Sequence, residues 1–469
     1  MAFPAPAASP IHRGRLFGRM VARMVATLAA AALTAQPAAA EQSILRDAET
    51  EQLLQEMVAP LTIAAGLRPG AVEVVLVNDP SINAFVAGGQ RIYINAGLIN
   101  AADTANEVQG VLAHEMGHIT GGHIISGYDN MAKAGRIQLL SMLVGVAAAL
   151  AGAGEAGMGA VALGQQAALG TYLGFSRTQE ASADAAGVTF LSKAGITGKG
   201  SLAFFRKLQG EAFRYGYRQD EEAGFASTHP LSGDRIARLE GDYQKDPAWN
   251  RPPDAGQQAR FLRIKAKLYG YLAEPKQVLA HYPEYLTDAP ARYARAYAWH
   301  KDAQMDRAIA ETDALLASDP ANPYFLELKG QVLLESGKPA QALAPLRDAT
   351  RLTGNAPLIA STFGHALIAT EDPVNLAEAE QVLRAAVGKD RENPFAWYLL
   401  GMVYGGRGDM PRARLASAEQ QIMTGQPRQA MESAKAAMAG LPQDTPDWIR
   451  AQDVEMVARA ELERRDKRR

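Results

Sequence analysis

The amino-acid sequence predicts a mainly α-helical protein with a small β-sheet, in which an α+β domain precedes an all-α solenoid of helical repeats. Two observations lead to this fold class. The β-rich segments are confined to residues 71–95, and beyond residue 259 small residues recur at a fixed spacing along consecutive helices. We expect four regions: a leader over residues 1–40, an α+β domain over residues 41–245, a Pro-rich linker over residues 246–258 and a repeat domain over residues 259–469.

The first forty residues predict a cleaved export signal. Four arginines precede an Ala-rich apolar run from Met24 to Ala35, and Pro37-Ala38-Ala39-Ala40 follows it. A basic region, an apolar region and a small-residue A-x-A site are typical of a signal peptide, so we expect cleavage before Glu41. The alternative is an N-terminal membrane anchor, but the apolar run is short for a span of about 20 residues.

Composition excludes several function classes. The 469-residue chain has a net charge of −2, which falls to −6 without the leader because residues 1–40 hold four arginines and no acidic residue. This balance argues against bulk binding of nucleic acid. The absence of cysteine excludes disulfides, a Cys-ligated metal, a thiol nucleophile and a lipid anchor on an N-terminal Cys. An exported chain without cysteine suits the bacterial periplasm, which is the localisation that we expect.

The α+β domain is predicted to begin with one helix and three strands. Residues 47–66 carry apolar side chains on one helical face, and residues 71–77 (AVEVVLV) are β-rich. A further β pair covers residues 82–86 and 91–95, on either side of two glycines. We expect the last strand to be a sheet edge on which an extended peptide pairs by β-augmentation, through Arg91, Ile92, Tyr93, Ile94 and Asn95.

The following helix, residues 106–119, carries the motif His114-Glu115-Met116-Gly117-His118. A spacing of four places both imidazoles on one helical face, one turn apart, so that they can share a metal ion. Glu115 lies beside them, placed to take a proton from water bound to that metal. One Zn²⁺ per chain is the expected cofactor, because imidazole nitrogen plus one carboxylate suits zinc.

The residues after this motif exclude the metzincin pattern H-E-x-x-H-x-x-G-x-x-H. Gly121 occupies the glycine position, but Ile124 stands where the third histidine belongs, and His123 comes one residue early. We therefore interpret His123 as a structural residue and look for the third ligand elsewhere.

Residues 139–163 form an apolar segment with three possible structures. Its first sixteen residues carry no charge but are rich in Gly and Ala. The segment could be a membrane span, a buried helical hairpin or a flap in peripheral contact with a membrane. Sixteen residues are short for a span, so we favour a buried or interfacial helix pair.

A predicted helix farther along supplies the third ligand. Glu180 and Asp184 are four residues apart and share one helical face. Glu180 can complete a His-His-Glu zinc site, and Asp184, one turn away, can accept the N–H of a ligating imidazole and so fix its orientation. The alternative is a solvated acidic face, which is less favoured beside the two histidines of the preceding motif.

One more histidine stands before a predicted helix, in Ser227-Thr228-His229-Pro230-x-x-x-x-Arg235. The His229 ring could reach the cleft and stabilise an oxyanion as a hydrogen-bond donor. It could also bind the metal as a fourth ligand and keep the site latent. A surface histidine before a helix is the third interpretation.

The repeat domain has one recurring period. Gly330, Gly364 and Gly401 are separated by 34 and 37 residues, and the same spacing recurs among four alanines and three prolines: Ala308, Ala342, Ala379, Ala413, Pro323, Pro357 and Pro394. The three extra residues fall at Glu371-Asp372-Pro373. Trp397-x-x-Leu400-Gly401-x-x-Tyr404 followed by Ala413 matches the tetratricopeptide signature. Stacked repeats of this kind form concave surfaces that bind peptides and proteins.

Four motifs together resemble a known peptidase family. In chain order they are Asn83-Ala84-Phe85, His114-Glu115-x-x-His118, Ser176-Arg177-x-x-Glu180-x-x-Ala183-Asp184 and His229-Pro230-x-x-x-x-Arg235. Residues 41–240 resemble the HExxH peptidases that include HtpX and the CAAX prenyl proteases. With its leader and repeats, the whole chain resembles the BepA-like family of periplasmic zinc proteases.

The resemblance implies a site and a role. It implies that His114, His118 and Glu180 bind zinc, that Glu115 is the general base and that His229 is a regulatory or transition-state histidine. It also implies a role in outer-membrane protein quality control, near the β-barrel assembly machinery.

Two functions stay open at this point. One is an exported zinc endopeptidase that cleaves unfolded or misassembled proteins and recruits them, or a partner, through the repeats. The other is a periplasmic tetratricopeptide adaptor or chaperone in which proteolysis is secondary or latent. The intact Glu115 favours the protease, because an inactive site has no need of a base.

Overall fold

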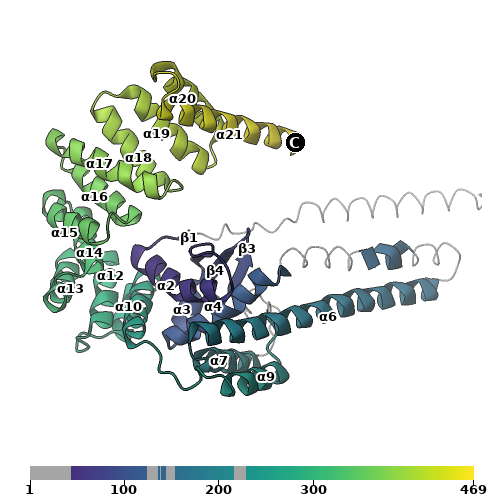
Figure 1. Ribbon diagram of the computed structural model, residues 1–469. Coiled ribbons are helices and arrows are strands. Elements are labelled where there is room, and N and C mark those ends of the chain that lie inside the picture. The colour runs from purple at the N-terminus through teal and green to yellow at the C-terminus, as the bar shows by residue number, and fades with distance from the viewer. Residues whose placement is uncertain (1–43, 124–135, 138, 144–153, 216–228, 469) are drawn as a thin grey trace, which may run out of the picture. The chain divides into compact units, whose positions relative to one another are not determined.

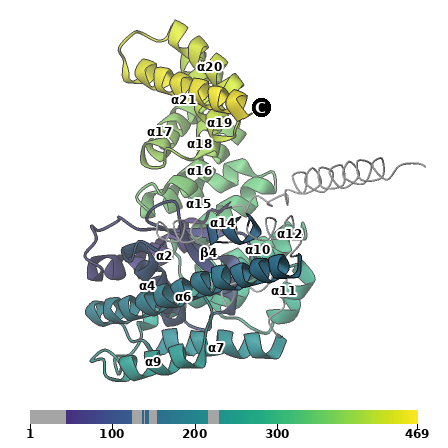
Figure 2. The same cartoon turned by 90° about the vertical axis from the view of Figure 1, so that its right-hand side faces the viewer.

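The computed structural model describes residues 44–123, 136, 137, 139–143, 154–215 and 229–468, and it is mainly helical with one small sheet (Figures 1 and 2). The predicted fold class is confirmed: a sheet and its helices come first, and helical repeats follow. The predicted leader over residues 1–40 lies outside the described residues, so its cleavage stays a prediction. The boundaries predicted at residues 245 and 258 also stay predictions.

The sheet has the strand order β1-β2-β4-β3. Its strands are β1 (Ile44–Leu45), β2 (Glu73–Val77), β3 (Ala84–Ala87) and β4 (Arg91–Asn95). β2 pairs in parallel with β4, and β3 pairs with β4 in antiparallel fashion, so that Val75 and Phe85 both lie opposite Tyr93. The rings of Phe85 and Tyr93 stack on one face with centroids 5.1 Å apart.

The prediction that residues 91–95 form a sheet edge is wrong. Arg91, Ile92, Tyr93, Ile94 and Asn95 form β4, which has a hydrogen-bonded partner on each side. Ile92 and Ile94 are fully buried, whereas β3 buries only Ala84 on that face. The more deeply buried strand of the hairpin is therefore the inner one, and β3 is an edge among the described strands.

The helices of the described residues that accompany this sheet include α2 (Ala48–Ala64), α3 (Ala96–Ala101), α4 (Ala105–Thr120), α6 (Gly154–Ala194), α7 (Lys199–Tyr215), α9 (Gly233–Gln244) and α10 (Ala255–Leu272). α4 packs against both α6 and α7, which lie beside it in Figures 1 and 2. A Cβ on Gly117 would lie 2.6 Å from the Ala183 oxygen, and one on Gly110 would lie 2.5 Å from the Ser201 Cα. Glycine at these two positions therefore lets α6 and α7 approach the backbone of α4.

The start of α4 is fixed by reciprocal capping. The Thr104 hydroxyl accepts a hydrogen bond from the Glu107 N–H, and the Glu107 carboxylate accepts one from the Asp103 N–H. Such caps satisfy backbone donors that the first turn of a helix leaves unpaired. The register of the His-Glu-x-x-His motif along α4 is thus set at the first turn of the helix.

The apolar segment predicted over residues 139–163 is described only in part, because residues 144–153 lie outside the described residues. Residues 139–143 are helical, and residues 154–163 open the 41-residue helix α6. Leu139, Leu140, Met142 and Leu143 are 51–62% exposed, so these side chains are not buried. Among the residues that the structure describes, no helix combines the length and the apolar character that crossing a membrane requires.

The remaining described helices pack against their neighbours in the chain, as α14 does on α15, α16 on α17 and α18 on α19. Their bounds are α11 (Pro275–His281), α12 (Ala289–Lys301), α13 (Met305–Ser318), α14 (Pro323–Glu335), α15 (Pro339–Leu352), α16 (Pro357–Ala369), α17 (Pro373–Lys389), α18 (Pro394–Gly406), α19 (Met410–Met423), α20 (Pro427–Gly440) and α21 (Pro446–Arg468). Three of the recurring alanines, Ala308, Ala342 and Ala379, are fully buried. A Cβ on Gly330 would lie 2.3 Å from the Leu346 Cγ of the paired helix.

A buried ion cluster joins α2 to α10 and α12. Lys267 of α10 forms ion pairs with Asp47 and Glu49 at the start of α2. Glu49 also accepts hydrogen bonds from Tyr293 Oη of α12 at 2.9 Å and from Arg263 Nε at 2.6 Å. Because buried charges are stable only when paired, this cluster fixes the first helix of the sheet domain against α10 and α12.

The cluster predicts a pH dependence of stability at Glu327 of α14. The pKa of Glu327 is raised to about 8, mainly by burial. The charge of Lys267 opposes this rise, and the charges of Asp47 and Glu49 add to it. A carboxyl whose pKa is raised on folding stabilises the fold below its unfolded pKa of 4.5, and this contribution is lost as the pH rises through 8. A Glu327→Gln variant should therefore gain Tm relative to the wild type as the pH rises from 5 to 8. Calorimetry would contradict this if the Tm difference were independent of pH.

Candidate metal centre

α4 places the two motif histidines and the glutamate in the interior. The His114 and His118 rings lie one turn apart, with centroids 4.8 Å apart and Nε2 atoms 3.2 Å apart. His114 is 2% exposed, Glu115 is 1% exposed and His118 is 9% exposed. Buried polar groups with converging ring nitrogens indicate a binding site rather than a solvated helix face.

α6 brings the predicted third ligand to the same point. Because Gly117 lets Ala183 approach α4, Glu180 of the preceding turn faces the two histidines. Glu180 Oε2 lies 3.4 Å from His114 Nε2, and Glu180 Oε1 lies 3.4 Å from His118 Nε2. The alternative of a solvated acidic face is thereby excluded for Glu180, which is buried.

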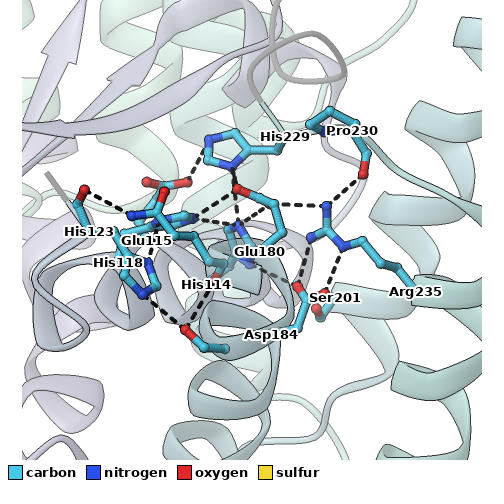
Figure 3. Close-up of polar contacts among 12 residues, drawn as sticks. His114, Glu115, His118, His123, Glu180, Asp184, Ser201, His229, Pro230 and Arg235 are labelled. Carbon is cyan, nitrogen blue, oxygen red and sulfur yellow. Dashed lines mark hydrogen bonds and ion pairs between the residues drawn. The ribbon is translucent and has the colours of Figure 1, made fainter. Parts of the chain in front are cut away.

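His229 completes the group. It lies in the turn before α9, and its Nδ1 lies 3.0 Å from Glu180 Oε1 and 3.3 Å from His114 Nε2 (Figure 3). Its other ring nitrogen, Nε2, lies 3.5 Å from Glu115 Oε1. His229 is therefore not a surface histidine: the structure buries it between the predicted ligands and the predicted base.

The geometry of this group fits a tetrahedral zinc ion. One ligating atom from each of His114, His118, Glu180 and His229 lies within 4.8 Å of the others. Zinc binds such nitrogen and oxygen atoms at about 2.0–2.2 Å in tetrahedral geometry, which separates neighbouring ligand atoms by about 3.4 Å. The separations of 3.0–3.4 Å among the closest pairs match this requirement.

A second set of contacts holds the ligands in place. Asp184 Oδ1 lies 3.0 Å from His114 Nδ1, and Nε2 of that ring is directed at the group. Arg235 donates to both oxygens of Asp184, at 2.8 and 2.9 Å, and to the Pro230 carbonyl at 2.8 Å. Arg235 also pairs with Glu180 Oε2 at 3.0 Å. One guanidinium thus connects the α6 carboxylates to the turn that carries His229 (Figure 3).

The electrostatics of the two α4 histidines differ. Burial lowers the pKa of His118 to about 4, and the charges of His114 and His229 act in the same direction. For His114, burial also favours the neutral ring, but the hydrogen bonds to Asp184 and Glu180 outweigh it and raise the pKa to about 10. Without a metal, a proton on His114 offsets the nearby carboxylates. A cation bound at the group would take over that role.

Glu115 has the environment of a general base. Burial raises its pKa above the usual value of 4.5, with His229 and His114 opposing the shift and Glu180 adding to it. A raised pKa makes a carboxylate a better proton acceptor near neutral pH. Its Oε1 lies 3.5 Å from Nε2 of His229, beside the group that His114, His118, Glu180 and His229 form.

The structure brings together each predicted site residue except those of β4. His114, Glu115, His118, Glu180, Asp184 and His229 form one connected group. Sequence reasoning missed the role of Arg235, although its motif had been noted, and it missed Phe205, whose ring packs edge-on against His114 with centroids 5.7 Å apart. No local signal could have found Phe205, which lies on a different helix from the motif.

Comparison with known proteins agrees with this geometry. The profile of peptidase family M48 matches residues 45–242. Two similar proteins are both named beta-barrel assembly-enhancing protease. The one from Yersinia pestis is 25% identical over 384 residues, which cover 78% of this chain and 76% of that protein. The one from Escherichia coli (strain K12) is 24% identical over 386 residues, which cover 77% of each.

A solved structure is also similar to part of this chain. It is described as YrrB, a TPR protein with an unusual peptide-binding site. It is 22% identical, covers 39% of this chain and 94% of its own, and has a TM-score of 0.31.

Proposed function

Because residues 45–242 are a peptidase family M48 domain, and hence a metallopeptidase domain, we propose that this chain is an exported zinc-dependent endopeptidase of the periplasm. Its substrates are unfolded or misassembled proteins, with outer-membrane β-barrels as the main class, as the names of its relatives suggest. The observation that carries the proposal is the buried group of His114, His118, Glu180 and His229 with Glu115 beside it.

His114, His118 and Glu180 would hold one zinc ion. When bound, zinc lowers the pKa of water from about 15.7 toward about 7 and polarises the scissile carbonyl. Glu115 accepts the proton of the attacking water and delivers it to the leaving amine. Asp184 keeps the His114 ring in the tautomer that presents Nε2 to the metal.

His229 would be the fourth ligand of a resting, latent enzyme. A catalytic zinc site has three protein ligands and one open position, but here four protein side chains converge. The His229 ring also faces Glu115 through Nε2. Withdrawal of this one side chain would therefore open the metal site and release the base together.

Substrate would pair with the sheet edge at β3 and arrive by way of the repeats. β3 packs against α4, so a strand added to its outer side would run beside the metal centre. Pairing of this kind recognises backbone more than side chains, which suits unpaired strands of a misassembled barrel. The repeat helices would recruit the substrate or the assembly machinery on their concave face.

The test is cleavage of one barrel protein in two states. The mature chain with zinc should cut the barrel when it is unfolded and leave the same barrel intact once it is folded. A chelator should abolish cleavage, and zinc should restore it whereas Mg²⁺ should not, because imidazole-rich sites favour zinc. If cleavage persisted without metal, the enzyme proposal would fail. If the chain held the barrel soluble without cutting it, the adaptor function would be favoured.

A further inference from the structure

The turn after α4 folds one more histidine back onto the metal centre. Gly121 ends the helix, and its N–H donates to the Gly117 carbonyl at 2.9 Å. Gly122 follows with a φ of 61°, a left-handed conformation that favours glycine. A Cβ on Gly121 would lie 2.3 Å from His123 Nε2. The two glycines thus provide the turn and the space by which His123 returns to His118.

His123 belongs to a continuous chain of polar contacts. Its Nδ1 lies 3.0 Å from His118 Nδ1, and its Nε2 lies 2.9 Å from the Ser182 hydroxyl. That hydroxyl lies 3.2 Å from the Gln179 carbonyl, to which it can donate, and the Gln179 side chain donates to the His123 carbonyl at 3.0 Å. His123 is therefore held by α6 through residues on either side of the ligand Glu180.

Only one arrangement of protons satisfies this chain when His118 binds a metal. Its Nε2 faces the metal group, so its Nδ1 must carry the proton and donate. His123 must then accept at Nδ1 and carry its own proton on Nε2, which it donates to Ser182. The Ser182 hydroxyl in turn donates a hydrogen bond to the Gln179 carbonyl, so each donor in the chain of contacts has an acceptor.

We propose that His123 is a positioning residue for His118: its ring accepts the His118 Nδ1–H and is oriented by Ser182. The inference rests on the proposed function, because it requires that His118 bind zinc through Nε2. The two ligand histidines of α4 are thus oriented differently. The His114 Nδ1 lies 3.0 Å from the carboxylate of Asp184, whereas the His118 Nδ1 lies 3.0 Å from an imidazole, to which it donates in this arrangement. A neutral acceptor orients the ring without adding a further negative charge to the centre.

His123 is not itself a metal ligand in this arrangement. It contacts the side of the His118 ring opposite the ligating nitrogen, and it is absent from the ligand group found among the described residues. His123 is thus a structural residue whose role is to orient the His118 ring.

The test measures zinc affinity by chelator competition in the mature full-length chain, together with the absorption spectrum of bound Co²⁺. His123→Leu should weaken zinc binding about 10–100-fold, as is usual when the hydrogen-bond partner of a ligand is lost, and should alter the Co²⁺ bands. His123→Asn, which places an oxygen near the position of Nδ1, should bind zinc within a few-fold of the wild type. Ser182→Ala should fall between the two variants.

His281→Leu is the matched control, since it removes a histidine at the end of α11 whose ring packs on Tyr269 and Tyr282. It should leave zinc affinity unchanged. Unchanged affinity in His123→Leu would overturn the inference, as would equal losses in the Leu and Asn variants, which would indicate packing alone. If the wild-type chain bound no zinc, the proposed function would fail first.

Discussion

Replacing Glu115 with glutamine should abolish proteolysis while leaving zinc bound. The amide has the shape of the carboxylate but cannot accept a proton, and loss of a general base lowers a rate by about 10²–10⁴-fold. Glu115 is not among the four ligating residues, so zinc stoichiometry should stay at one per chain. The measurements are cleavage of an unfolded barrel protein and metal analysis of the same sample.

A matched control separates this effect from the loss of a charge. Glu56→Gln removes a half-exposed carboxylate of α2 that pairs with Arg260 at 2.6 Å. It should retain wild-type cleavage. Cleavage at the wild-type rate by Glu115→Gln would contradict the assigned base.

The same variant also distinguishes the two functions. If Glu115→Gln restored barrel assembly in cells that lack the protein, the repeats would account for the biological role and proteolysis would be secondary. If it failed to restore assembly although it folded and bound zinc, the role would require peptide-bond cleavage.

The site was predictable where its residues share one helix. His114 and His118 are four residues apart, and a helix of 3.6 residues per turn must place them on one face. The same argument paired Glu180 with Asp184. The two helices approach each other closely because Gly117 and Ala183 at their crossing are small. The sequence does not indicate that these two residues meet, so the contact between the helices could not be predicted.

The remaining features depend on contacts between distant segments. The sequence indicated a hairpin over residues 84–95. The alternation of apolar and polar residues in it does not indicate which of the two hairpin strands pairs with β2. In the structure Ile92 and Ile94 are buried in the inner strand β4, and β3 is an edge strand where β4 had been predicted to be one. His229 is 49 residues from Glu180, so only the fold could show that its Nδ1 lies 3.0 Å from that carboxylate.

Glu180→Gln should weaken zinc binding more than Asp184→Asn does. Glu180 lies 3.4 Å from the Nε2 atoms of both His114 and His118, so an amide there removes the one anionic ligand of the group. We expect a loss of more than about 100-fold, beyond the range for residues that only support a ligand. Asp184→Asn replaces the charged carboxylate beside His114 Nδ1 with a neutral amide and should cost about 10–100-fold.

The two variants control for each other, because both carboxylates lie one turn apart on α6 and both pair with Arg235. Each substitution removes one negative charge beside the same guanidinium, and Arg235 makes two contacts with Asp184 but one with Glu180, so a loss caused only by a freed Arg235 would be at least as large in Asp184→Asn. An excess loss in Glu180→Gln therefore measures ligation itself. If Asp184→Asn lost zinc and Glu180→Gln retained it, the two roles would have to be exchanged. Chelator competition on samples with matched circular dichroism would decide between these outcomes.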